Sequence, residues 1–370
     1  MVSKKFLSGI FILLVFLFIN TSPCIGKETS LTLIYTSNTL GELEPCSTCP
    51  EGGDNGGLSR RGHYLKTVKG EAKNLLILDG GDALVMSYYG QMKEREKARR
   101  WAEFVLKLYE TLGYQIFNIG DTDLGLGVEY LKNLQKKSKI AFISANLKEK
   151  KTRSPVFKPY LIREIEGIKI GILGLITTEI SPNIQKELKN YLIENPIQTA
   201  TETINRFMAS CDHIVALAHL TPSEIESLAK EVPRISIIIG GNDRSFIFPK
   251  QIHRSIYIQT DAFGAHIGRL NLNLIKGSSE FMDNKSKALI QKRIEETQKM
   301  IEDPRYEKEI KTLKELQGIL IQQKKKMPSP EDKNTYENYL ILMHPKMESD
   351  KEIEKLIDSA RNQLKRPIPY

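Results

Sequence analysis

The sequence predicts an α/β protein in which sheets and helices form layers. Between residues 31 and 274, short apolar runs alternate with amphipathic stretches, the pattern of strands that alternate with helices. Several runs are apolar at every position, as strands buried on both faces are. Polar residues and glycines follow many of these runs, where the carboxyl ends of the strands would lie.

The apolar runs and the periodic stretches give the predicted elements in order. The strands are expected at 31–36, 74–79, 115–119, 140–144, 161–166, 169–176, 213–218, 235–239, 256–259 and 268–274. Helices are expected at 94–112, where Gly113 follows as a stop signal, and at 128–137, 197–209 and 222–230. The stretch 42–58 is long, irregular and rich in glycine, and is therefore predicted to be a loop.

Residues 1–26 are predicted to be an export signal peptide. Lys4 and Lys5 form its positive n-region, and 6–19 is an apolar stretch shorter than the ~20 residues of a membrane span. Contact with a membrane would require that this leader stays uncleaved or that Cys24 is lipidated, and Pro23 disfavours lipidation. The protein is therefore expected in the periplasm or outside the cell. Residues 27–276 are expected to form a domain, and 277–370 a helical tail.

Composition excludes nucleic acid as a partner. Without Lys4 and Lys5 the formal charge is +7, and no basic stripe or aromatic platform concentrates it. The densest basic run, 324–326, ends a predicted helix, where cations are common. The fractions of 40% hydrophobic and 27% charged residues are ordinary for a globular chain, and four cysteines are too few for a disulfide scaffold.

The composition changes after Gly277. Residues 280–365 are highly charged in both signs and are periodic in Leu, Ile and Met. Asp303 and Pro304 have the order of an N-cap and a first-turn proline, and another helix is expected at 351–364. This tail is predicted to be a helical hairpin with further helices. It would either pack on the α/β domain or present a surface to a protein partner.

Polar side chains follow five of the predicted strands. Such strand ends meet in the crevice where layered α/β proteins bind ligands. One segment alone would be a weak signal, because turns favour Gly, Asn and Asp for backbone reasons. The five segments are Ser37-Asn38-Thr39-Leu40-Gly41, Asp79-Gly80-Gly81-Asp82, Gly120-Asp121-Thr122-Asp123, Leu217-Ala218-His219 and Gly240-Gly241-Asn242-Asp243-Arg244.

The order and spacing of these segments resemble the calcineurin-like metallophosphoesterases, and most closely the exported 5'-nucleotidase/UDP-sugar hydrolase (UshA-like) family. The likeness runs from 31 to 274 and includes 57–61, 144–147 and 167–174. The resemblance implies a four-layer α-β-β-α sandwich and a phosphorylated small molecule as the ligand. It also implies two divalent metals that orient the phosphate and activate a water.

At the first metal position the chain departs from the family pattern. The resemblance implies Asp-x-His after the first strand, and these positions are Asn38 and Leu40. The second His of the family's closing motif is Arg244, whose fixed positive charge opposes a cation. Only Asp82, which matches the bridging Asp, remains for this metal. Asn38 and Arg244 are therefore candidates for binding the substrate instead.

At the second metal position more oxygen and nitrogen donors remain. Asp82 and His219 match family ligands, while Asp121 and Asn242 replace an Asn and a His by other potential donors. Thr122 stands where the family has its catalytic His. We therefore expect at most one divalent metal ion, with no haem and no nucleotide cofactor. The alternative is that Asp121 and Asn242 are turn residues in a site that binds nothing.

The loop after the first strand contains Cys46-Ser47-Thr48-Cys49, which leaves several interpretations open. Pro50 excludes haem attachment, and no second pair completes a zinc site. A static disulfide, a redox-active pair and a metal-binding pair all remain. Arg60, Arg61 and Arg244 would favour a thiolate if they lie close. A cysteine-bearing branch of the UshA-like proteins resembles this combination.

Two functions from different classes follow. The first is an exported phosphoesterase-like enzyme with a degenerate two-metal site and single-metal or thiol-dependent chemistry. The second is a catalytically inactive scaffold that binds a partner through the crevice and the helical tail.

Overall fold

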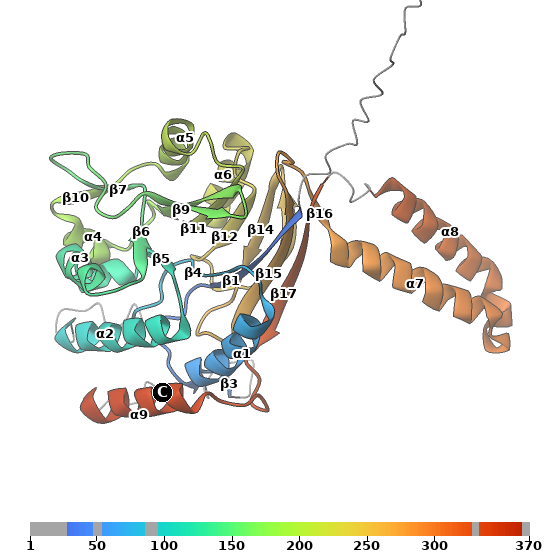
Figure 1. The fold of residues 1–370 in the computed structure, drawn as a ribbon, viewed down its shortest axis with the longest axis horizontal. Coiled ribbons are helices and arrows are strands. Elements are labelled where there is room, and N and C mark those ends of the chain that lie inside the picture. The colour runs from blue at the N-terminus through green and yellow to red at the C-terminus, as the bar shows by residue number, and fades with distance from the viewer. Residues whose placement is uncertain (1–27, 47–53, 86–94, 328–332, 365–370) are drawn as a thin grey trace, which may run out of the picture.

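Two large β-sheets pack face to face, and helices cover both outer faces (Figure 1). The computed structural model describes residues 28–46, 54–85, 95–327 and 333–364. Three apolar clusters fill the spaces between the layers, one between the sheets and one beneath each helical layer. This confirms the predicted four-layer α-β-β-α architecture. Among the described residues, no helix is both long and apolar enough to cross a membrane.

The first sheet has seven strands in the order β16-β17-β15-β1-β4-β5-β6. Strands β1, β4, β5 and β6 are parallel, whereas β15 pairs with β1 in the antiparallel direction and β17 pairs antiparallel with β15. Their bounds are β1 Glu28–Thr36, β4 Leu75–Asp79, β5 Ile116–Asn118, β6 Ala141–Ile143, β15 His266–Ile275, β16 Phe281–Asp283 and β17 Asn334–Leu342.

The second sheet has six strands in the order β13-β14-β12-β11-β9-β8, with β9, β11, β12 and β14 parallel. Two short ribbons, β2 with β3 and β7 with β10, lie outside the large sheets. The bounds are β8 Tyr160–Ile165, β9 Ile168–Ile176, β11 His213–His219, β12 Ile237–Gly240, β13 Ile247–Ile252, β14 Ser255–Gln259, β2 Pro45–Cys46, β3 Asn55–Gly56, β7 Leu147–Glu149 and β10 Tyr191–Ile193.

Helices α1, α2 and α9 cover the first sheet, and α5 and α6 cover the second (Figure 1). Helix α6 begins at a capping box, in which the side chains of Thr221 and Glu224 each bond the other's backbone. The bounds are α1 Leu58–Glu71, α2 Arg95–Leu112, α3 Val128–Lys136, α4 Pro182–Gln185, α5 Pro196–Phe207, α6 Pro222–Glu231, α7 Asn284–Glu302, α8 Ile310–Lys326 and α9 Lys351–Leu364, with 3-10 turns at Asp123–Leu126, Lys186–Leu188 and Pro304–Glu309.

The C-terminal segment contains the predicted helical hairpin, and it also contributes strands that were not predicted. Helices α7 and α8 pack against each other, and Gln317 donates a hydrogen bond to Gln298 across the pair. Figure 1 shows this hairpin extending away from the layered body. Strand β17 then returns to pair with β15, and α9 buries Ile353 and Ile357 against the first helical layer. The tail is therefore helical only in part.

Helix α1 was also missing from the prediction. Its buried face includes Ser59, Arg60, Arg61 and Gly62 as well as leucines. A helix whose buried side carries polar residues lacks the apolar stripe by which helices are found in a sequence. Strand β13 was missed as well, because only its last residue is fully buried.

Candidate metal centre and crevice

The carboxyl ends of the two parallel strand sets meet at one edge of the sandwich. The amide of Asn118, the last residue of β5, donates to two carbonyl oxygens: that of Gly80 after β4, at 3.2 Å, and that of Leu175 in β9 of the second sheet, at 2.9 Å. The backbone N–H of Ser37 donates to the Thr260 hydroxyl at 3.0 Å, which joins the ends of β1 and β14. These bonds hold the two sheets together where ligand crevices form in layered α/β folds.

Three of the predicted metal ligands come together at this edge. One donor atom from each of Asp82, Asp121 and His219 lies within 4.8 Å of the other two. The Nε2 atom of His219 is 2.9 Å from the Oδ1 of Asp121 and 3.4 Å from the Oδ2 of Asp82. Asp82 and Asp121 follow β4 and β5, and His219 is the last residue of β11, so their proximity depends on the contact between the two sheets.

Burial and mutual charge shift the titration of this trio. Burial raises the pKa of Asp82 to about 7. Burial disfavours the charged imidazole of His219, but the carboxylates of Asp82 and Asp121 outweigh it and raise its pKa to about 9. Burial also disfavours charge on Asp121, yet its hydrogen bond with His219 lowers its pKa overall. A cation at the trio would therefore have to displace the protons that these raised pKa values retain, so its binding would depend on pH.

Backbone hydrogen bonds fix the position of Asp82. The Asp123 carboxylate accepts from the N–H of Asp82 at 2.9 Å, from Gly120 at 3.0 Å and from Leu84 at 3.1 Å. The Thr122 N–H donates to the Oδ1 of Asp82 at 2.9 Å. Burial raises the pKa of Asp123 well above its usual value. Its role is to hold the loop rather than to reach a ligand.

Backbone strain is concentrated at the same edge. Among the described residues, eight that are not glycine have positive φ, and Asn38, Leu40, Asp82 and Phe263 belong to this crevice. Such conformations cost free energy and persist where the surrounding structure enforces them, which is common at functional sites. Here the enforcing bonds are Leu40 N–H to the Asp82 carbonyl at 2.8 Å and Phe263 N–H to the Asn38 carbonyl at 2.9 Å.

The residues at the first metal position offer no ligand atom or have other contacts. Leu40 is 1% exposed and offers no ligand atom. The Asn38 amide donates to the backbone carbonyl of Asp243 at 3.0 Å, so its nitrogen holds the neighbouring loop. Arg244 is exposed, and its guanidinium lies 5.8 Å from the ring centroid of Phe263.

Asn242 follows β12 beside the trio. A Cβ atom at the preceding Gly241 would lie 3.0 Å from the Nδ1 of His219 and 2.7 Å from the carbonyl oxygen of Gly80. The chain can pass this close only because residue 241 is glycine. Asn242 is half-buried at this position.

The structure places only part of the predicted cysteine pair. Cys46 belongs to β2, which pairs with β3 through Pro45–Gly56 and Cys46–Asn55. A Cβ atom at Gly56 would lie 3.4 Å from the carbonyl oxygens of Phe263 and Gly264, which brings this ribbon to the crevice rim. Cys49 and the Cys46 side chain lie outside the described residues. So does the predicted leader.

Arg61 belongs to a buried polar network. Its side chain is fully buried and donates to the hydroxyl of Tyr114 at 3.1 Å and those of Tyr109 and Thr39 at 3.4 Å. The tyrosine rings stack with centroids 4.1 Å apart. Tyr109 also donates to Asp79 at 3.1 Å, and burial raises the pKa of Asp79 to about 6.

This buried network beneath the crevice was missed at the sequence level. The only sequence signal for this network is the Arg60-Arg61 pair. An arginine that is fully buried, as Arg61 is, nearly always has hydrogen-bonding partners.

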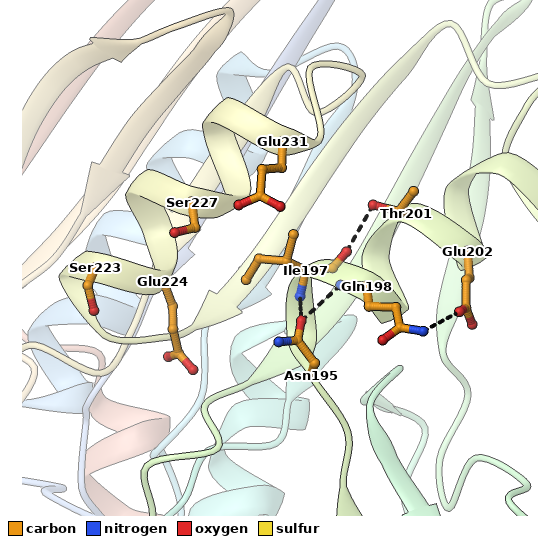
Figure 2. A pocket seen from close by; sticks show the side chains of 9 residues that line it. All are labelled: Asn195, Ile197, Gln198, Thr201, Glu202, Ser223, Glu224, Ser227 and Glu231. Carbon is orange, nitrogen blue, oxygen red and sulfur yellow. Dashed lines mark hydrogen bonds between the residues drawn. The ribbon is translucent and has the colours of Figure 1, made fainter.

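A separate cavity of about 680 Å³ lies between α5 and α6 (Figure 2). Glu202, Glu224 and Glu231 line it, and its other lining residues are uncharged. A cavity whose only charges are carboxylates repels phosphate. The crevice with Asp82, Asp121 and His219 is therefore the stronger candidate for a phosphate-binding site.

Comparison with known proteins finds relatives among nucleotidases and phosphodiesterases. No family model matches the chain. The chain is 25% identical over 270 residues to a 2',3'-cyclic-nucleotide 2'-phosphodiesterase/3'-nucleotidase of Salmonella typhimurium, covering 63% of this chain and 41% of that protein. It is 23% identical over 288 residues to a 5'-nucleotidase of Diplobatis ommata, covering 67% and 46%. The matched region thus spans less than half of these relatives.

Solved structures show the same architecture over nearly the whole chain. A 5'-nucleotidase precursor from Thermus thermophilus superposes with a TM-score of 0.61 at 19% identity, covering 91% of this chain and 59% of that one. The fold is that of the calcineurin-like 5'-nucleotidases. The calcineurin-like phosphoesterase YfkN from Bacillus subtilis gives 0.65 at 15% identity, covering 91% of this chain and 98% of that one. The first expectation from the sequence, the fold, is thereby confirmed.

Proposed function

We propose that this chain is an exported phosphoesterase-like protein that binds a nucleotide-like phosphorylated small molecule in the crevice, with at most one divalent cation. The names of its relatives, nucleotidases and cyclic-nucleotide phosphodiesterases, support the ligand class. The observation that carries the proposal is the trio of Asp82, Asp121 and His219 at the edge where the strands end.

The donor set fits one cation. Two carboxylates and an imidazole are ligands that Mn²⁺ and Zn²⁺ both accept. Asp82 is buried and its pKa is raised, because burial makes the charged carboxylate unfavourable. A bound cation would neutralise this charge and so stabilise the ionised carboxylate. Asn242 follows the glycine that touches His219 and would supply a fourth donor. A cation held there would polarise a phosphoryl oxygen and acidify a water.

The donor set does not fit a second cation on the other side of Asp82. Leu40 is buried and has no donor atom, while Arg244 carries a permanent positive charge. In this proposal Asn38 and Arg244 contact the phosphorylated ligand instead. The Asn38 carbonyl accepts a hydrogen bond from the backbone N–H of Phe263, and the Arg244 guanidinium lies over the Phe263 ring.

The site also lacks the histidine that protonates the leaving group in the resembling family. Thr122 stands where the resembling family has its catalytic His, and its hydroxyl donates to the backbone carbonyl of Val85 at 3.4 Å. A threonine hydroxyl does not titrate near neutral pH, so general acid catalysis, typically worth ~10²–10⁴-fold, is missing. We therefore expect slow hydrolysis of nucleoside monophosphates.

The test combines metal analysis with turnover. The wild-type protein should bind one equivalent of Mn²⁺ or Zn²⁺, and Asp82→Asn should bind none and lose any hydrolysis. Asp212→Asn is a matched control, because Asp212 lies at the opposite end of β11. Vigorous turnover with two bound equivalents would overturn the single-cation proposal, and no bound metal would overturn the enzyme.

The β2–β3 ribbon, which contains Cys46, offers a second candidate source of catalysis at the crevice rim. Because Gly56 touches the Phe263–Gly264 turn, a thiol on this ribbon would lie near the crevice. Thiol-dependent activity should then survive removal of metal by a chelator and be lost in Cys46→Ser.

The projecting hairpin favours the scaffold as the second candidate function. Leu316 and Ile319 are 45% and 56% exposed on α8, and neither helix of the hairpin belongs to the clusters that fill the sandwich. If the protein binds no metal, loss of partner binding in Leu316→Glu, with an unchanged melting temperature, would support the scaffold.

A further inference from the structure

Strand β8 forms one edge of the second sheet. It pairs with β9 on one side along its whole length. On its other side the described residues supply a neighbour only before the strand begins, where the Lys158 carbonyl accepts a hydrogen bond from the Ser144 N–H at 3.0 Å. An edge strand without a neighbour is a template on which another extended chain can pair.

Alternate residues of β8 turn their backbone polar groups outward. Just before the strand, the Pro159 carbonyl accepts a hydrogen bond from the Gly174 N–H of β9 at 3.3 Å. Bonded and non-bonded positions alternate along an antiparallel pair, so positions 161, 163 and 165 face β9 and the N–H and C=O of Ile162 face away from it. The Ile162 carbonyl accepts from the Arg163 side chain at 3.3 Å, which agrees with this direction. Outward groups of this kind are the ones that an added strand would bond.

A cavity of about 770 Å³ follows this open edge, and Tyr160, Leu161 and Ile162 line it. Successive side chains of a strand point to opposite faces of the sheet. Here Tyr160 packs on the apolar cluster beneath α5 and α6, whereas Leu161 packs on the cluster between the two sheets. A cavity that touches both side chains therefore runs along the edge of the strand rather than over one face. The rest of its lining comes from Lys148 of β7, the segment 153–159 and the last two residues of α5.

All the charged side chains that line this cavity are cations. They are Lys148, Arg153, Lys158 and Arg206. One carboxylate outside the lining, that of Glu194, offsets part of this charge, with oxygens 3.6 Å from the Lys148 Nζ and 3.2 Å from an Arg153 nitrogen. Lys158 and Arg206 are exposed and have no carboxylate partner among the described residues. The charge along this edge therefore complements an anionic partner.

Apolar side chains accompany these cations. The exposed fractions of Ile162 and Phe207 are 37% and 47%, which is high for large hydrophobic residues. The Phe207 ring stacks on Tyr160 with centroids 5.8 Å apart, and the Arg206 guanidinium lies 5.1 Å from the Phe207 centroid. A partner that matches this edge therefore has both acidic and apolar side chains.

We propose that the β8 edge, defined as residues 158–162 with Lys148, Arg206 and Phe207, binds an extended acidic segment of another protein. The segment adds as a strand to the second sheet, a known mode of peptide recognition. Its backbone bonds the outward N–H and C=O of Ile162, its carboxylates pair with the cations, and its apolar side chains contact Phe207. None of these residues belongs to the candidate metal centre, so the site is independent of the proposed function.

The open backbone groups favour a peptide over a membrane surface or a small anion. Lipid head groups and small anions would use the cations and the apolar side chains alone. An added strand also uses the backbone of Ile162, and it bonds through the amide N–H groups on one of its own sides. Binding that depends on those amides is therefore the property that distinguishes a strand from the other ligands.

The first experiment measures fluorescence anisotropy with labelled decapeptides that alternate glutamate with valine or lysine with valine. The acidic peptide should bind the wild-type protein more tightly than the basic one. N-methylation of one set of its alternate amides should weaken binding by roughly 2- to 13-fold for each hydrogen bond lost. Methylation of the complementary set, which faces away from β8, is the matched control and should leave binding unchanged.

Substitutions on the protein locate the binding. Lys158→Glu combined with Arg206→Glu should weaken the acidic peptide by roughly fivefold or more and strengthen the basic one. Lys250→Glu is the matched control, because Lys250 is exposed on β13 at the other edge of the same sheet. Phe207→Ala should also weaken the acidic peptide, whereas Phe248→Ala should not, since Phe248 is 67% exposed on β13.

Several outcomes would overturn the proposal. Equal binding of the acidic and basic peptides, equal effects of the two methylation sets, or no binding of either peptide would each exclude an acidic strand at this edge. Binding of phosphatidylglycerol vesicles that the double variant abolishes, without binding of the peptides, would assign the surface to a membrane and overturn the peptide. Loss of peptide binding in Lys250→Glu alone would place the peptide at β13 instead.

Discussion

The two ends of strand β11 each carry a buried histidine, and the two side chains behave in opposite ways. His213 is 2% exposed, neither ring nitrogen has a hydrogen-bond partner, and burial lowers its pKa to about 4. His219 is fully buried at the other end, where two carboxylates raise its pKa to about 9. The strand, the residue type and the burial are the same. Only the charges nearby differ.

This difference shows what makes one end of the sandwich a candidate site. His213 packs edge-on against Phe281 at 5.3 Å and is a core residue. His219 faces Asp82 and Asp121, which the first sheet presents at the carboxyl ends of its strands. In a parallel arrangement the carboxyl ends collect the loops that carry polar side chains, whereas the amino ends pack as core.

The largest expected effect is on metal binding. His219→Ala should weaken the affinity for Mn²⁺ or Zn²⁺ by more than the ~10–100-fold that outer-shell changes cause, because it removes a direct ligand. His213→Ala should leave the affinity unchanged. Isothermal titration at fixed pH measures both. Equal affinity in wild type and His219→Ala would mean that the trio is a relic.

The next effect is on the part of the pH dependence of stability that His213 contributes. Its folded pKa of about 4 lies below the ordinary 6.5, so the unfolded chain binds more protons between these values. The contribution of His213 to stability should therefore fall with a slope that totals roughly 3 kcal/mol as pH drops from about 6.5 to about 4. Asp79 and Asp82, whose pKa values are raised, contribute in the opposite direction over this range. His213→Leu should remove most of this slope in urea unfolding, and the exposed His253 in His253→Gln should not. An unchanged slope in His213→Leu would contradict the assignment.

A smaller effect is expected from the cysteine pair. A structural disulfide that closes so short a loop contributes about 2 kcal/mol by loop-closure entropy. If the pair is redox-active instead, reduction with glutathione should proceed without unfolding, at potentials typical of exchange proteins. Thermal melting in glutathione buffers distinguishes the two. A bridge that resists reduction, together with a lower melting temperature in Cys46→Ser and no other change, would exclude redox chemistry.

The smallest effect should come from Arg244. Because its side chain is exposed, its repulsion of a cation at the trio is screened by solvent and salt. Arg244→Ala should strengthen metal binding by no more than a few-fold, and the gain should disappear in high salt. Weaker metal binding in this variant would show that Arg244 supports the site.

Strong local patterns explain what the sequence predicted well. Helix α2 was expected at 94–112 and spans Arg95–Leu112, because its apolar residues recur at helical spacing and Gly113 stops it. Strands β9 and β11 were found because they are apolar and buried on both faces. Trp101, on the apolar side of α2, is 8% exposed, and its indole N–H donates to the Gly41 carbonyl.

The same reasoning failed where a strand pairing or a side-chain contact depends on how the chain turns in three dimensions. Strand β17 pairs with β15, but the hairpin α7–α8 separates them in the chain, so its segment looked like part of a charged tail. The Asp261–His266 pair is close in sequence, yet only the turn at Phe263 brings the two side chains together.

The sequence by itself determined the layers and which residues could act. Apolar runs and helical periodicity are local properties that each segment carries alone, and the strand ends displayed Asp82, Asp121 and His219 as candidate ligands. Only the tertiary structure decided that their donor atoms lie within 4.8 Å, and that His213 on the same strand has no partner. The physical reason is that ligand geometry and pKa depend on distances between separate strands, which no local pattern fixes.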